Sequence, residues 1–351
     1  MRMLSALIVI LFAAVSARAF DSRDADNAFS AYNFSFYVVT NGMGFYKATT
    51  NGTCSTFWMW AEEIEMIEDT YERTHSPATR QMIEQSIAGF AHVHGTNWMW
   101  NKYNDDIMWM TIACERCYLI TTNPFYRDIA KKNFDAMYSR AWDNALGGGL
   151  WWTTDNRGKH ACINGPAAIS ACLLCQITGD KSYLEKAKAI YAWERGALFT
   201  PRGAVRDNMR ADGTIGKKAF TYNEGTFIGA ADLLWKFTGD TNYLSDALLA
   251  ANFTRSFLSN DGNLPVYGNG DVAGFNGIFV RWMSHFATDD HLWPQFHGWL
   301  LGNANSAWQV RRSDNLSWQD WNSPTPDGTL NSWNCSSSVV VLQVIPPEQP
   351  K

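Results

Sequence analysis

Two adjacent carboxylates stand in the stretch KYNDDIMWM, where Asp105 and Asp106 directly precede an apolar run. Two carboxyl groups that share a site cannot both ionise cheaply, so we expect one pKa to rise while the other stays low. Such a split supplies a proton donor and a nucleophile, the two groups that cleavage of a glycosidic bond requires. Alternatively, the pair caps a helix, but capping needs only one acidic side chain and does not explain the flanking Tyr103 and Trp109.

The spacing of the pair bears on the type of reaction. Retaining glycosidases hold their two carboxyl groups about 5–5.5 Å apart, whereas inverting enzymes hold them farther apart to admit a water molecule. Neighbouring residues at the start of a helix can reach the shorter distance but hardly the longer one. The sequence therefore favours retention through a covalent glycosyl-enzyme, and it leaves open which aspartate is the nucleophile.

A repeat along the chain supplies the elements that position the pair. The segment LLCQITGDKSYLEKAKAIYAW (173–193) aligns without gaps with LLWKFTGDTNYLSDALLAANF (233–253), and YLITTNPFYRDIAKKNFDAMYSRAW is a further copy upstream. Each copy has the pattern of a helix, a tight turn and a second helix, with Asp180 and Asp240 as natural N-caps. Repeats of this length with two helices each indicate an array or ring of helical hairpins.

Six predicted helix starts recur along the chain, which is the number needed to close a ring. They lie near Phe57, Asp106, Asn164, Glu224, Asn276 and Asn334. We therefore predict an all-α protein with an (α/α)6 barrel, in which one helix of each hairpin lines the inside and the other covers the outside. The inner helices then run parallel, so their N-terminal ends, which carry partial positive charge, meet at one mouth and favour carboxylates there.

Aromatic and polar residues expected at this mouth are candidates for binding sugar. Aromatic rings offer flat faces for stacking, and amide or carboxylate groups can bind hydroxyls, although the same residues could be core wedges or helix caps. The candidates are Trp98, Trp100, Tyr103, Asn104, Trp151, Trp152, Asn164, Tyr222, Asn223 and Glu224. His160 is expected at the surface or in contact with sugar, not as a metal ligand.

Seven cysteines are available for pairing. Cys54 lies just before the first predicted inner helix and Cys335 lies at the start of the sixth, and these two units are neighbours in a closed ring. We therefore predict a Cys54–Cys335 disulfide that fastens the closure. Two C-x-x-C pairs fall at equivalent positions of the repeat, which favours a structural origin over a zinc site. The pairing of the remaining cysteines stays open: Cys114, Cys117, Cys162, Cys172 and Cys175.

The N-terminal segment has the pattern of a cleaved secretory signal, with Arg2, an apolar run from Leu4 to Val15 and the ending Ala17-Arg18-Ala19. We expect residues 1–19 to be removed and residues 20–351 to form a single catalytic domain. The C-terminal segment lacks the long hydrophobic tail of a lipid-anchor signal, so we expect no membrane anchor. Five sequons suit a secreted, extracellular glycoprotein: Asn33, Asn51, Asn252, Asn315 and Asn334.

Charge and motif content narrow the class of partner. The net charge is −5 and no block of lysine or arginine stands out, which argues against nucleic acid. The chain carries no H-E-x-x-H motif, phosphate-binding loop or nucleotide fingerprint, so we expect neither a metal nor a cofactor. We expect a monomer.

Several motifs in the same order resemble glycoside hydrolase family 76 between about residues 50 and 290: YNDDIMWM, GGGLWW, INGPAAISACLL, FTYNEGTFIGAADLL and FNGIFVRWM. The resemblance implies an (α/α)6 barrel and a retaining endo-α-1,6-mannanase or a related fungal cell-wall enzyme. It also implies that Asp105 is the nucleophile and Asp106 the acid/base. Glu224 stands where the family often has glutamine and Asn276 where lysine is common, which bears on contacts to sugar.

These observations together predict a secreted retaining glycosidase that cleaves α-1,6-mannan. One alternative is a transglycosylase of the same family, which passes the glycosyl unit to a sugar acceptor instead of water. Another is a non-catalytic mannan-binding protein, against which the intact acid pair argues.

Overall fold

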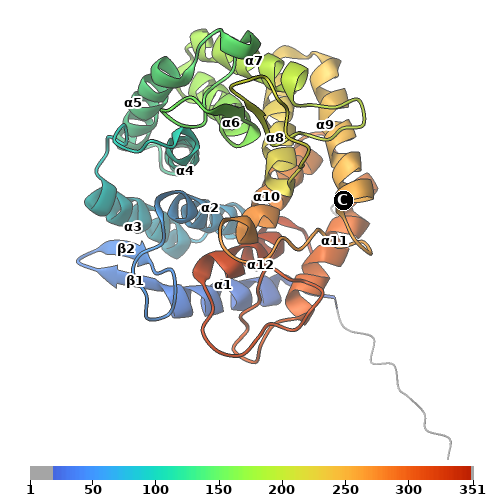
Figure 1. Ribbon diagram of the computed structural model, residues 1–351. Coiled ribbons are helices and arrows are strands. Elements are labelled where there is room, and N and C mark those ends of the chain that lie inside the picture. Colours follow the sequence, from blue (N-terminus) through green and yellow to red (C-terminus); the bar gives the residue numbers. More distant parts are fainter. Residues whose placement is uncertain (1–18, 349–351) are drawn as a thin grey trace, which may run out of the picture.

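Twelve α-helices form the body of the protein in the computed structural model, which describes residues 19–348 (Figure 1). Each of six inner helices packs against the next, and the last of them, α12, packs against the first, α2. The inner helices are α2 (Phe57–Thr74), α4 (Asn104–Thr121), α6 (Ala161–Thr178), α8 (Thr221–Thr238), α10 (Phe275–Asp289) and α12 (Ser332–Val344). Their starts lie within three residues of the predicted ones. The (α/α)6 barrel is therefore confirmed.

Six outer helices cover this ring, and one of them comes from an unexpected part of the chain. The outer helices are α1 (Ser22–Phe36), α3 (Pro77–His94), α5 (Pro124–Ala141), α7 (Lys181–Ala197), α9 (Thr241–Phe253) and α11 (Trp293–Gln309). Five of them follow their inner helix directly, but α12 pairs with α1 at the opposite end of the sequence. Helix α1 was not predicted from the sequence, although Asp21 and Asp24 form a capping box at its start.

The T-G-D turns join inner to outer helices as predicted. Gly179 and Gly239 end α6 and α8 with φ of 75° and 70°, a left-handed conformation that glycine adopts without strain. Asp180 and Asp240 then cap α7 and α9 by accepting hydrogen bonds from the backbone of the second helical residue. Each tripeptide thus combines a helix stop with a helix start.

Helix α6 is the most apolar inner helix. Among residues 19–348, it alone is long and apolar enough to cross a membrane, but 83% of it is buried inside the protein. Its composition is that of an inner helix surrounded by α4, α7 and α8.

Hydrogen bonds between the two ends of the chain close the ring. The Tyr32 hydroxyl of α1 donates to Glu63 Oε1 of α2 at 2.9 Å. Gln343 of α12 donates to the Ala25 carbonyl of α1 at 2.9 Å and accepts from Arg73 of α2 at the same distance. A buried side chain therefore links each pair among α1, α2 and α12.

The predicted Cys54–Cys335 disulfide is wrong, because the structure leaves all seven cysteines as free thiols. The two segments do meet, since Ser55 and Ser332 place their hydroxyls 3.2 Å apart. Cys54 precedes Ser55 in extended chain, where successive side chains point to opposite faces, so Ser55 is buried while Cys54 is exposed. Cys335 is buried within α12. The ring closes through hydroxyl and backbone contacts instead.

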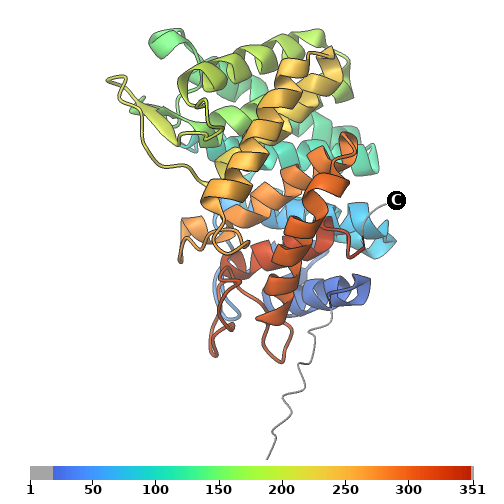
Figure 2. The same cartoon turned by 90° about the vertical axis from the view of Figure 1, so that its right-hand side faces the viewer.

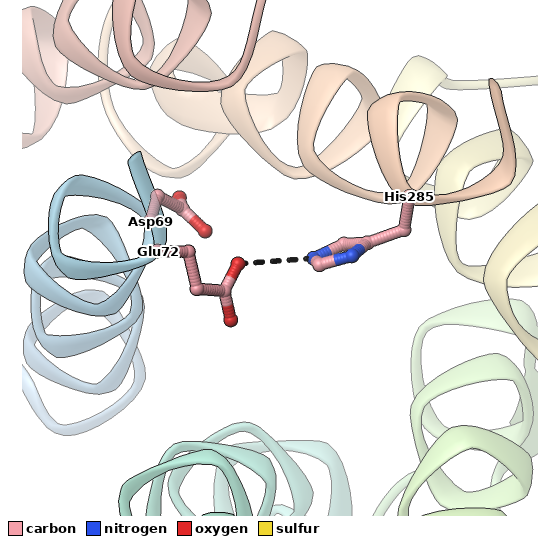
Figure 3. A group of neighbouring side chains, drawn as sticks. All are labelled: Asp69, Glu72 and His285. Atoms are coloured by element: carbon pink, nitrogen blue, oxygen red, sulfur yellow. Dashed lines mark ion pairs between the residues drawn. The ribbon is translucent and has the colours of Figure 1, made fainter. Parts of the chain in front are cut away.

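A buried ion-pair network joins three inner helices toward the ends of α2, α4 and α10 that lie away from the mouth. The Asp69 carboxylate accepts from Arg116 at 2.8 Å and from Arg281 at 2.9 Å. Figure 3 shows Asp69 beside Glu72 and His285, whose side chains form an ion pair at 3.6 Å. Arg116 also binds Glu72, at 3.0 Å. The same two guanidiniums also pair with Glu62, Glu65 and Glu68, so the carboxylates here belong to an extended ion-pair network.

Two small antiparallel sheets accompany the helices. One is a hairpin of β1 (Tyr37–Thr40) and β2 (Met43–Tyr46), and the other pairs β3 (Gly158–His160) with β4 (Asn208–Arg210), which α6 and α7 separate in the sequence. The β4 segment belongs to a loop that projects from the helices (Figure 2). The Ala161 N–H at the start of α6 donates to the Asp207 carbonyl at 2.9 Å, which fixes this loop at the mouth of the barrel.

The structure separates the predicted glycosylation sites. Asn334 is buried in α12 and donates to Asn269 at 2.9 Å, so it has no room for a glycan in the folded protein. Asn33 is partly buried and accepts from the Tyr46 hydroxyl. The sequons at Asn51, Asn252 and Asn315 stay predictions, as does the signal segment, nearly all of which lies outside the described residues.

The hydrogen bond from Tyr32 to Glu63 at the ring closure depends on whether the Glu63 carboxyl is ionised, so the stability of the closure should depend on pH. Burial raises the pKa of Glu63 to about 7. Between about pH 4.5 and pH 7, Glu63 therefore keeps its proton in the folded protein but releases it in the unfolded chain. The contribution of Glu63 to the free energy of unfolding is fully present below about pH 4.5 and is lost as the pH rises toward 7. We predict that Glu63→Gln, which cannot ionise, gains about 3 kcal/mol in free energy of unfolding relative to wild type across this window.

Urea unfolding at a series of pH values measures this difference. The same change at the exposed Glu185 of α7 corrects for loss of one surface charge. Parallel stability curves for Glu63→Gln and wild type between pH 4.5 and 7 would contradict the assignment.

Candidate active site

A pocket of about 500 Å³ lies at the N-terminal ends of the inner helices. Five of the six inner helices, or the segments leading into them, contribute to its walls. The lining residues are Thr56, Trp58, Tyr103, Asp105, Asp106, Trp109, Trp152, His160, Cys162, Asp207, Phe220, Tyr222, Asp271, Val272 and Phe275. No lysine or arginine is among them, so the pocket contains four aspartates and one histidine, and burial lowers the pKa of that histidine.

Asp105 and Asp106 stand in the first turn of α4, as the sequence predicts, and both carboxylates reach this pocket. Asp106 Oδ2 accepts from Asn101 Nδ2 at 2.8 Å. Asp105 Oδ2 accepts from the Cys162 thiol at 3.4 Å, whereas Asp105 Oδ1 accepts no hydrogen bond of ordinary geometry among residues 19–348, although the nearby Trp152 side chain favours the ionised carboxyl. Each carboxylate is thus held through one oxygen, and Asp105 keeps a buried oxygen available for a ligand.

The pocket makes both aspartates hard to ionise. Desolvation, together with a smaller contribution from the charge of Asp106, raises the pKa of Asp105 to about 8 against the opposing effects of Trp152 and Cys162. Desolvation also raises the pKa of Asp106, to about 6, with a smaller contribution from Asp271. Near neutral pH the pair therefore holds one proton between its two carboxyl groups.

Aromatic rings form the walls above the pair. The Trp152 ring stacks on His160 with centroids 4.5 Å apart, and Tyr103 lies 5.3 Å from the same tryptophan. On another wall, Tyr222 stacks on Phe275 at 3.8 Å. Such paired rings present broad apolar faces beside polar groups, the combination that a sugar ring requires.

Three of the predicted aromatic residues, Tyr103, Trp152 and Tyr222, do line the pocket. The structure places the other three elsewhere. Trp98 is 1% exposed and packs against Phe90 and the neighbouring Phe57, so it is a core residue. Trp100 is 62% exposed and stacks on His94 outside the pocket. The indole nitrogen of Trp151 donates to Asp143 at 2.7 Å, also away from the pocket.

The predicted amide ligands Asn104 and Asn164 are buried supports instead of lining residues. Asn104 donates to the Trp151 carbonyl and accepts from Arg140. Asn164 accepts from the Leu150 N–H at 2.9 Å and donates to the His160 carbonyl at 2.7 Å. Both therefore fix the loop 150–160 that carries Trp152, which is a positioning role and not contact with a ligand.

Asn223 and Glu224 are buried in the same way at the start of α8. Asn223 donates to Asp207 Oδ1 at 3.1 Å, and Glu224 Oε1 accepts from the Val205 N–H at 2.8 Å. Asn276, the other departure from the family pattern, donates to the Pro265 carbonyl. These buried side chains hold the joining segments that contain Val205, Asp207 and Pro265, and they do not line the pocket themselves.

Two lining residues, Asp207 and Asp271, were not predicted from the sequence. Both lie in segments that join an outer helix to the next inner helix, outside the repeat, so the alignment of repeats passes over them. The sequence does contain a signal for these residues. A segment that leads from an outer helix into an inner helix must end at the mouth, where the inner helices begin. Acidic and aromatic residues within them are therefore candidates for the site.

Comparison with known proteins gives the same fold and a similar pair. The family description that matches is glycosyl hydrolase family 76, over residues 23–346. An inactive variant of an α-1,6-mannanase from Salegentibacter sp., with two adjacent aspartates changed to asparagine and α-1,6-mannotriose bound, is 31% identical. That comparison has a TM-score of 0.86 and covers 92% of this chain and 98% of that one.

Curated relatives from yeasts are also similar. A mannan endo-1,6-α-mannosidase of Saccharomyces cerevisiae is 25% identical over 324 residues, and one of Candida albicans is 23% identical over 276. The matches cover 79% and 69% of this chain. The matches span 69% of the Saccharomyces cerevisiae protein and 60% of the Candida albicans protein. The second match therefore falls short of two thirds of that protein's length.

Coupling between the two carboxylates can be measured directly. We predict that Asp106→Asn lowers the pKa of Asp105, because it removes the negative charge that helps to keep Asp105 protonated. Asp271→Asn should lower the pKa of Asp106, on which the charge of Asp271 acts. Carboxyl ¹³C chemical shifts followed against pH report both values. An Asp105 pKa that is the same in Asp106→Asn and wild type would show that the two groups titrate independently.

Proposed function

This chain belongs to glycosyl hydrolase family 76, and on that premise we propose that it cleaves α-1,6-mannosidic bonds in mannan. The observation that carries the proposal is the adjacent pair Asp105 and Asp106, which share one proton on the floor of an aromatic pocket. The mannanase with 31% identity is inactive when two adjacent aspartates become asparagine, which supports the same location for the chemistry here.

The proposed reaction has two steps and retains the configuration of the sugar. Ionised Asp105 attacks the anomeric carbon through Oδ1 while Asp106 donates its proton to the departing glycosidic oxygen, leaving a mannosyl ester on Asp105. Asp106, now ionised, takes a proton from a water molecule that attacks the anomeric carbon and releases Asp105. The unpartnered Oδ1 of Asp105 supports its role as the nucleophile.

This assignment requires the shared proton to reside on Asp106 when substrate is bound. Burial and the charge of Asp106 raise the pKa of Asp105, so binding must lower that pKa for Asp105 to act as the ionised nucleophile. Hydroxyl groups of the sugar can donate to the unpartnered Asp105 Oδ1 and stabilise its charge, in addition to the Cys162 thiol at Oδ2. We propose that this stabilisation moves the proton to Asp106, where the leaving oxygen needs it.

The walls of the pocket suit the rest of the substrate. Trp152 and Tyr103 present apolar faces for one mannose ring, and Tyr222 with Phe275 presents another. The Asp207 and Asp271 carboxylates can accept hydrogen bonds from mannose hydroxyls. We further propose that the enzyme is secreted, on the basis of the signal-like segment at residues 1–19.

Replacing either aspartate tests the proposed site. We predict that Asp105→Asn and Asp106→Asn each reduce kcat on linear α-1,6-mannan by about 10²–10⁴-fold or more, because each removes one of the two groups that act on the bond. Release of reducing ends measures the rate, and circular dichroism checks that the fold is intact. Asp128→Asn on the surface of α5 is the matched control. Near-normal activity in either pocket variant would remove that residue from the mechanism.

The configuration of the first product tests the two-step reaction. We predict that an α-mannoside yields α-configured product first, because two successive displacements restore the original configuration. Proton NMR of early reaction mixtures distinguishes the anomers. A β-anomer that appears first would require a single displacement by water. In the same experiment, added α-1,6-mannobiose that becomes extended would identify transfer to a sugar acceptor in place of hydrolysis.

A further inference from the structure

A second hollow, of about 600 Å³, lies beside the active-site pocket. We call it the basic hollow. It is lined by Thr200, Pro201, Arg202, Ala204, Arg206, Lys217, Ala219 and Phe253. Three of these eight residues are cations and none is acidic.

The basic hollow and the active-site pocket share a wall made of two short extended segments. Arg206 forms an antiparallel β-bridge with Ala219 across this wall. The N–H of the next residue, Asp207, donates to the Lys218 carbonyl at 2.9 Å. Arg206 and Ala219 line the basic hollow, whereas Asp207 and Phe220 line the active-site pocket. Successive side chains of an extended segment point to opposite faces, so the two cavities lie on opposite faces of one ribbon.

The cations of the basic hollow are not neutralised by the protein. Among residues 19–348, Arg202, Arg206 and Lys217 form no ion pair with a carboxylate, whereas other basic groups near the mouth do, such as Lys159 with Asp143. Arg206 is held in place because it donates to the Lys217 carbonyl at 2.8 Å. A cluster of three unpaired cations in a hollow attracts anions, even though the whole chain carries a net charge of −5.

The shape of the basic hollow indicates what kind of anion it accepts. The ring of Phe253, at the end of α9, supplies an apolar surface beside the charges. An aromatic face next to guanidinium groups suits a sugar that bears an acidic group, because the ring contacts the sugar while the arginines bind the acid. Phosphate fits this arrangement well, since its three oxygens can accept from two guanidiniums and an ammonium at once.

We propose that the basic hollow binds an anionic substituent, best a phosphate ester, on a mannan chain whose neighbouring residues occupy the active-site pocket. This inference rests on the proposed function and extends it to the substrate class. A mannan chain longer than the pocket leaves it over one of its edges, and the ribbon that carries Asp207 is one of these edges. The enzyme would thereby distinguish phosphorylated from neutral mannan.

The test compares one mannan preparation before and after removal of its phosphate. The variant is Arg202→Gln combined with Lys217→Gln, which removes two exposed charges and leaves Arg206 to hold the ribbon. We expect wild type to show a kcat/KM on the order of tenfold higher for phosphorylated mannan at low salt. This preference should fall toward unity in the double variant and at high salt, while kcat/KM on the dephosphorylated mannan stays within about twofold of wild type.

A matched control separates local binding from general charge. Lys132→Gln combined with Arg23→Gln removes two exposed charges from the outer helices α5 and α1 and should keep the preference. Mannan oxidised to carry carboxylates in place of phosphate shows which kind of acidic group the basic hollow binds. If wild type prefers this mannan as strongly as phosphorylated mannan, the hollow binds anionic mannan in general. Equal kcat/KM of wild type on phosphorylated and dephosphorylated mannan would overturn the proposal, as would an equal loss of preference in the control variant.

The two proposals can fail separately. If wild type cleaves neither mannan, the proposed function is wrong, and calorimetric titration of the same proteins with a phosphorylated mannooligosaccharide still tests the hollow. Binding that the double variant loses and the control variant keeps would support the hollow. Equal affinity in all three proteins, or no binding in wild type, would reject it.

Discussion

Closure of the helical ring is the constraint on which the rest of the structure depends. The pocket exists because inner helices far apart in the sequence begin at one mouth, and they converge only if α12 packs against α2. The closure has no covalent link. Helix α1 covers the seam, and buried side chains such as Tyr32, Glu63 and Gln343 connect the three helices. A buried polar group without a hydrogen-bond partner destabilises the fold more than the same group in solvent does. A wrong pairing of helices would leave these groups without partners, so the hydrogen bonds also specify which helices pack together.

Acidic residues have opposite environments at the two ends of the barrel. Away from the mouth, Asp69 is buried between two guanidiniums, and its charge contributes to holding α2, α4 and α10 together. At the mouth, Asp105 and Asp106 lie in a pocket without a lysine or arginine, where desolvation raises both pKa values. Asp69 therefore contributes to the fold through its guanidinium partners, whereas Asp105 and Asp106 have no such partner in a pocket that is open to a ligand.

Sequence reasoning predicted the framework better than the individual contacts. The spacing of the repeat predicted six inner-helix starts to within three residues, and the turns between helices were predicted from local signals such as Gly179 and Asp180. It did not distinguish Trp98 in the core from Trp152 in the pocket, since both tryptophans lie in irregular segments whose course is set by tertiary packing. Asp207 was missed for the same reason, because it lies in a joining segment that has no counterpart in the repeat.

The pairing of α1 with α12 has a consequence for how the chain folds during synthesis. Gln343 bonds to Ala25 across 318 positions of sequence, so the first helix to leave the ribosome waits for nearly the whole chain before its partner exists. Tyr32 can meet Tyr46 and Glu63 early in synthesis, but the face of α1 that packs on α12 has no cover during that time. Five hairpins can stack progressively as an open arc, but the arc becomes a ring only in the last step. The interval before that step is when the nascent protein is most exposed to aggregation and most dependent on chaperones.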